Sequence, residues 1–71
     1  MRNYYYDIVA SFCTENGSTG KDVVCRGFKT LKDALSHIKS NRISKIDYYN
    51  CIKIEKRIVE TAWLVDIITI K

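Results

Sequence analysis

The chain has 71 residues and a formal charge of +4, which predicts a single domain over residues 1–71 and excludes a multidomain enzyme or a repeat array. Its 46% hydrophobic and 28% charged residues are typical of a folded domain, and the absence of proline argues against a linker. A core this small is marginal for a monomer, so self-association into a homodimer stays open.

The first third of the chain predicts a β-hairpin. Residues of alternating character over 4–13 indicate a strand with one buried and one open face. Turn-forming residues then gather over 15–22, where Asn16-Gly17 favours a tight reversal. A second strand is expected over 23–28, with Gly27 marking a bulge or a close approach of the backbone just before the helix.

A helix is expected next, from Thr30 to about Asn41. Thr30 is a suitable N-cap, and Asp33 stands three residues later, as in a shortened capping box. The apolar residues that follow recur at helical spacing and give one narrow packing face: Leu31, Ala34, Leu35 and Ile38.

After Arg42 the pattern returns to a period of two and predicts a long strand over residues 46–59. A turn without Gly or Pro must follow, because a last strand is expected over residues 63–70. That strand is dense in β-branched residues, which favours a central place in the sheet with both faces buried.

The predicted fold class is α+β, a small two-layer sandwich in ββαββ order with one helix packed on a mostly antiparallel four-stranded sheet. One short helix covers only one face, so the other face of the sheet is expected to stay open. The phase of the strands assigns these residues to the open face: Tyr5, Asp7, Val9, Ser11, Tyr49, Cys51, Lys53, Glu55, Arg57 and Val59.

The sequence contains no clear motif for a phosphate, metal or catalytic site. The stretch 17–21 lacks the first glycine of a phosphate-binding loop and precedes a strand. Cys13, Cys25, His37 and Cys51 are too widely spaced for a structural zinc site. The sequence therefore predicts no catalytic residues, no metal and no cofactor. Three cysteines, an odd number, with no sign of an export signal predict reduced thiols in the cytoplasm. Cys13 and Cys25 flank one hairpin, which could bring them near each other.

The open face carries the functional prediction. Tyrosine and arginine give large contact area and directed hydrogen bonds, so the predicted partner-binding residues are Tyr5, Tyr49, Lys53 and Arg57. The mixture of charges favours a protein partner. The alternative is RNA or single-stranded DNA, whose bases would stack on the tyrosines.

No stretch is long and apolar enough to predict a membrane segment. Ile, Lys, Asn and Tyr are abundant, as in the products of AT-rich genomes. Small proteins of this composition are similar to accessory products of phages or mobile elements, which often block a host protein. The expected function is therefore that of a small non-catalytic binding module, an inhibitor that acts stoichiometrically on a host protein.

Overall fold

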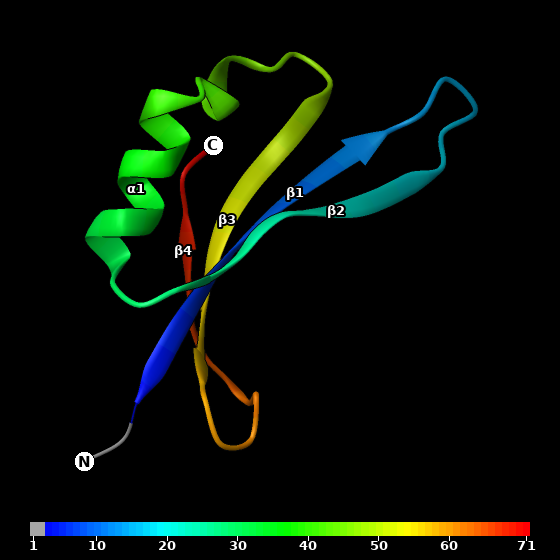
Figure 1. Cartoon of the computed structure of the whole chain (residues 1–71). Helices are drawn as coiled ribbons and strands as arrows, with labels where there is room; N and C mark the ends of the chain where they lie inside the picture. Colours follow the sequence, from blue (N-terminus) through cyan, green and yellow to red (C-terminus); the bar gives the residue numbers. More distant parts are fainter. Residues whose placement is uncertain (1–2) are drawn as a thin grey trace.

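Four strands and one α-helix make up the computed structural model, which describes residues 3–71 (Figure 1). The elements follow in the order β1 Tyr4–Cys13, β2 Thr19–Phe28, α1 Leu31–Ser40, a 3₁₀ turn η1 Ile43–Lys45, β3 Tyr49–Ile58 and β4 Leu64–Thr69. The helix packs on one face of a four-stranded antiparallel sheet, which confirms the α+β class and the ββαββ order.

The strand order across the sheet is β2-β1-β3-β4. Strands β2 and β3 flank β1 and run in the same direction, and α1 makes the crossover between them (Figure 1). This crossover places β3 beside β1, on the side opposite β2. The short turn over residues 59–63 then places β4 on the outer side of β3. The prediction that the last strand is central was therefore wrong, because β4 forms an edge of the sheet.

The helix α1 begins and ends where the sequence predicts. The Thr30 hydroxyl accepts a hydrogen bond from the Asp33 backbone N–H at 3.1 Å, and the Asn41 side-chain amide donates to the His37 carbonyl at 3.0 Å. In residues 3–71 no helix is long and apolar enough to cross a lipid bilayer. The sequence did not predict η1, which Arg42 introduces with a left-handed φ of 52°.

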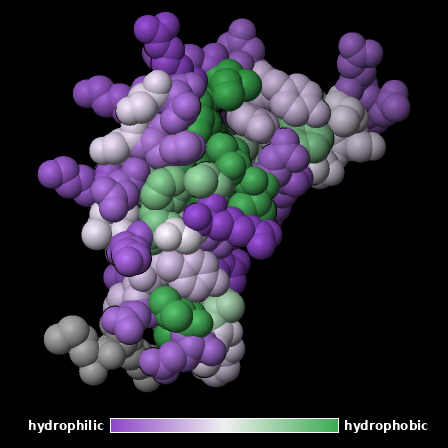
Figure 2. Space-filling model, in the orientation of Figure 1, coloured by the Kyte–Doolittle hydropathy of each residue, from purple (hydrophilic) through white to green (hydrophobic). Residues whose placement is uncertain are grey.

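The core lies between α1 and the two central strands. Ile8 pairs with Ile54 and Ala10 pairs with Ile52, so all four side chains share the face that α1 covers. The buried cluster comprises Ile8, Ala10, Ala34, Ile38, Ile43, Ile52 and Ile54. Three isoleucines of this cluster are fully enclosed, at about 1.5–3 kcal/mol each, so stability rests on few side chains. Figure 2 shows apolar surface beside the helix on this side of the molecule.

The β1–β2 hairpin projects beyond the helix (Figure 1), and the molecule measures 45 × 25 × 15 Å. Its turn closes through a hydrogen bond from Thr14 N–H to the Ser18 carbonyl at 2.8 Å, with Gly17 at a φ of 82°. Strand β2 begins at Thr19, earlier than predicted. Gly20 pairs with Phe12, whose ring lies across it so closely that a Cβ atom at this position would overlap the ring.

The three cysteines are free. Cys13 pairs with Thr19 beside the turn, whereas Cys25 pairs with Ile8. Five residues of extended strand separate these two positions on β1, a distance of about 17 Å. The prediction that Cys13 and Cys25 lie near each other was therefore wrong.

Candidate functional site

Three of the four residues predicted to bind a partner share the open face of the sheet. Tyr5 pairs with Arg57, and Val9 pairs with Lys53. These positions alternate with the buried isoleucines, so their side chains point away from α1. The structure thus brings Tyr5, Lys53 and Arg57 together on a continuous surface of β1 and β3.

Tyr49 lies on the other face, which corrects its predicted place. The register of β1 and β3 shifts after Ser11, so that Phe12 pairs with Tyr49. This irregularity turns Tyr49 to the side of Phe12 and of the core. The Tyr49 hydroxyl donates to Asp22 Oδ2 at 3.2 Å. Burial, and next the hydrogen bond to Asp22, raise the pKa of Tyr49 above its usual value.

Tyr49 belongs to a small aromatic cluster at the end of the sheet. The rings of Phe12 and Tyr48 stack at 4.9 Å, and those of Tyr48 and Tyr49 are tilted at 5.8 Å. Both Ile46 and Tyr48 precede β3, which is shorter than predicted. Tyr49 also packs against the buried core, which gives it a packing role.

Asp7 is the buried charge of the open face, with 8% of its surface exposed. Its Oδ1 atom accepts a hydrogen bond from the Gly27 N–H at 3.1 Å. Gly27 has a φ of 80°, and it lies where the register of β1 and β2 shifts, which confirms the predicted irregularity. The carboxylate therefore ties β1 to the end of β2.

Arg57 is held by two hydrogen bonds at the edge of this face. Its Nη2 atom donates to Glu55 Oε1 at 2.9 Å, and its Nη1 atom donates to the Ala62 carbonyl at 2.8 Å. The hydrogen bond to Glu55 raises the pKa of Arg57 above its usual value against the opposing effect of burial. Glu55 pairs directly with Asp7, so the guanidinium offsets two neighbouring carboxylates. Much of its bonding capacity is therefore used within the molecule.

Tyr5 and Lys53 remain as the more available polar residues of the three. Tyr5 is half-buried, and Lys53 lies between Val9 and Thr69 of the neighbouring strands. No ion pair of Lys53 occurs among residues 3–71. Lys53 therefore contributes a cation to the open face that the Arg57–Glu55 pair does not involve.

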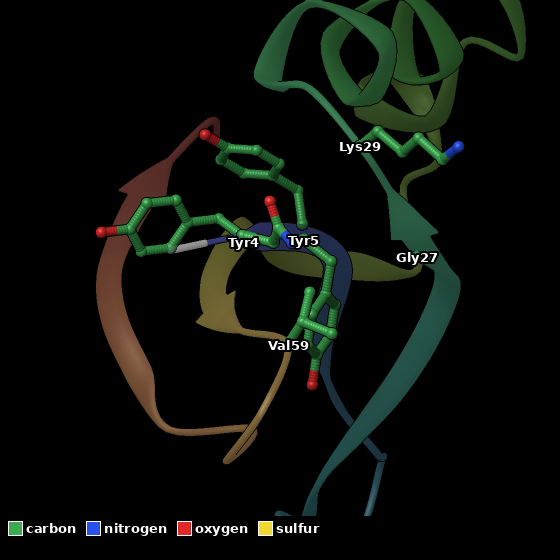
Figure 3. A pocket seen from close by; sticks show the side chains of 7 residues that line it. Tyr4, Tyr5, Gly27, Lys29 and Val59 are labelled. Carbon is green, nitrogen blue, oxygen red and sulfur yellow. The ribbon is translucent and has the colours of Figure 1, made fainter. Parts of the chain in front are cut away.

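A shallow hollow of about 590 Å³ adjoins the face where β2 leaves β1. It is lined by Asn3, Tyr4, Tyr5, Tyr6, Gly27, Lys29 and Val59. Figure 3 shows the ammonium group of Lys29 directed away from the tyrosine rings. The lining is mainly aromatic, with three consecutive tyrosines and one cation, Lys29, so the hollow offers aromatic contact area.

The strongest apolar exposure lies on β4 and its turn, which the sequence did not identify. Trp63 is 71% exposed, and Leu64, Val65 and Ile67 are each more than 40% exposed. Ile67 pairs with Glu55, so its side chain extends the open face beyond β3. The β-branched residues of β4, from which the sequence predicted a buried strand, are therefore the residues that form this exposed apolar edge.

Within residues 3–71 no group of three or more His, Cys, Asp or Glu residues is arranged to hold a metal ion. No protein-family model, curated protein or solved structure matches the chain.

Proposed function

We propose that the protein is a small non-catalytic binding module that covers a surface of a protein partner with the open face of its sheet. One observation carries the proposal: the single helix leaves a whole sheet face uncovered, and that face combines aromatic, aliphatic and charged side chains. Such a mixture is typical of protein interfaces.

The charges of this face favour a protein over a nucleic acid. Asp7 and Glu55 stand among Lys53 and Arg57, and Arg57 already donates to Glu55. Phosphate binding needs several available cations, because each neutralised phosphate contributes to affinity. The proposed contact residues are Tyr5 and Lys53, with Ile67 extending the apolar part and Arg57 supporting the surface from within.

We further propose that the module acts in the cytoplasm as a stoichiometric inhibitor of a host protein, as a phage or mobile-element product would. The three free cysteines suit a reducing compartment. The composition, rich in Ile, Lys, Asn and Tyr, supports this origin by analogy.

The test is a pull-down with tagged protein from a lysate of the organism that carries the gene, after nuclease treatment. Lys53→Glu changes the open face, and Lys39→Glu makes the same change on the exposed side of α1. We expect a protein that the wild type and Lys39→Glu retain and that Lys53→Glu loses. Loss of all bound material on nuclease treatment, or by a modest rise in salt, would instead indicate nucleic-acid binding.

A further inference from the structure

The outer edge of β4 has the features of a pairing edge. Five of its six residues are exposed, although four of the six are Leu, Val or Ile. Natural edge strands usually carry lysine, proline or inward charges that prevent pairing. Residues Leu64–Thr69 contain neither lysine nor proline, and Asp66 is their one charge.

The main-chain groups of β4 show which residues face outward. Ile70 N–H donates to the Ile52 carbonyl at 2.8 Å, so Ile70 bonds toward β3. In an antiparallel pair every second residue bonds to the neighbouring strand, so Ile67 and Thr69 present their N–H and C=O groups outward. The Ile67 N–H accordingly donates to the side chain of Asp66, at 2.8 Å from Oδ1.

We infer that the β4 edge pairs antiparallel with the β4 edge of a second copy of this chain. A two-fold axis at Ile67 sets Val65 opposite the partner's Thr69 and Asp66 opposite the partner's Ile68. No like charges then oppose each other, and the Ile67 residues of the two copies exchange two main-chain hydrogen bonds, to which Thr69 and the partner's Val65 add as far as the shift beside Leu64 allows. An axis at Asp66 would instead place two carboxylates in direct opposition, which is unfavourable.

A second copy is the occupant that the edge itself specifies. The opposite edge, β2, carries Lys21, Asp22 and Arg26 and is interrupted by register shifts, which protect it from pairing. The β4 edge carries a single charge, Asp66, and its register shifts at one place, beside Leu64. Pairing it with itself also enlarges a core that is small for a stable monomer.

The dimer would be one eight-stranded sheet whose two open faces lie side by side. Ile67 of each copy then lies at the centre of a continuous apolar strip, flanked by the Glu55 and Arg57 pairs. The inference is independent of what the open face binds. If that face binds a protein, however, the dimer presents two such sites at a fixed spacing.

Asp66 opposes this pairing in the single chain. Its carboxylate occupies the Ile67 N–H that the second strand needs, so dimerisation must displace it. Removing the carboxylate by Asp66→Ala releases one N–H in each copy. We expect the dimer dissociation constant to fall about tenfold in this variant.

Sedimentation velocity from about 1 µM to about 1 mM tests the inference, because an interface of one strand edge belongs to the small, weak class. We expect a monomer–dimer equilibrium in the wild type. Ile67→Lys should weaken it at least 100-fold, about 3 kcal/mol, by placing two charges on the axis. Val23→Lys makes the same change at an equally exposed valine of β2 and should leave the dissociation constant within about twofold.

Amide hydrogen exchange on the wild type tests, without any variant, whether the β4 edge forms the dimer interface. The Ile67 and Thr69 amides should become protected as the protein concentration rises, while the amides of β2 stay unchanged. A wild type that stays monomeric up to about 1 mM would overturn the inference. So would a dimer that survives Ile67→Lys but dissociates with Val23→Lys, or an open-ended polymer.

Discussion

We expect the Arg57 side chain to stabilise the fold, and the loss in free energy of unfolding on Arg57→Ala measures its contribution. The change removes a charge-assisted hydrogen bond to Glu55 and a second bond to the Ala62 carbonyl. The first is worth about 1.5–3 kcal/mol and the second about 1 kcal/mol. The pair is partly exposed, at 29% for Arg57 and 19% for Glu55, so screening favours the lower end.

We therefore expect Arg57→Ala to lower the free energy of unfolding by about 2–3 kcal/mol. A chain of this size has a total stability of about 4–11 kcal/mol, so the loss is a large fraction. The midpoint of thermal unfolding should fall by at least about 10 °C. Part of the effect comes from Asp7 and Glu55, which are left facing each other without a cation between them.

Urea unfolding followed by far-UV circular dichroism is the suitable assay, because Trp63 is too exposed to report on folding by fluorescence. Arg57→Lys keeps the charge but not the two-pronged geometry, so it should recover only part of the loss. A double-mutant cycle with Glu55→Gln isolates the pair and should give a coupling of about 1–2 kcal/mol. A loss below about 0.5 kcal/mol for Arg57→Ala would refute the reasoning, since an exposed arginine behaves that way.

Three further changes test other parts of the structure. Gly20→Ala pushes the ring of Phe12 off the strand and should cost at least about 1 kcal/mol in the same urea assay, whereas an unchanged midpoint would contradict the close packing. Ala62→Gly relieves a left-handed φ of 60° and should raise the stability by about 0.5–1 kcal/mol, and a loss would show that the turn is unstrained. Because the pKa of Tyr49 is raised in the folded state, its contribution to the free energy of unfolding is complete below pH 10.0 and is lost as the pH rises further. Tyr49→Phe should therefore lose less stability at alkaline pH than the wild type. An equal loss in both proteins would count against the Asp22 hydrogen bond.

The elements with local signals were predictable from the sequence. The helix follows from Thr30 and the spacing of its apolar residues, and the hairpin turn follows from Asn16-Gly17. Both depend on interactions within a few residues, which the sequence displays directly. Alternation likewise placed Tyr5, Lys53 and Arg57 on one face, because the pairing of β1 with β3 stays in register from Tyr4 to Ser11.

The remaining features depend on interactions between distant segments. The edge position of β4 follows from the crossover through α1, which no residue of β4 reveals. The face of Tyr49 depends on a register shift that has no glycine or proline to mark it. The hydrogen bond from Arg57 to the Ala62 carbonyl depends on a turn in which Ala62 has a left-handed φ, a conformation that the sequence marks with no glycine. Sequence patterns specify the period of a strand but not its neighbours.

The proposal that the open face binds a protein is tested most directly by photo-cross-linking from two serines. A photoreactive residue replaces Ser11 on the open face in one variant and Ser36 on the exposed side of α1 in the other. After exposure in nuclease-treated lysate, we predict a discrete cross-linked protein from position 11 and none from position 36. A cross-link from position 36 alone, or nuclease-sensitive cross-links from position 11, would contradict the proposal.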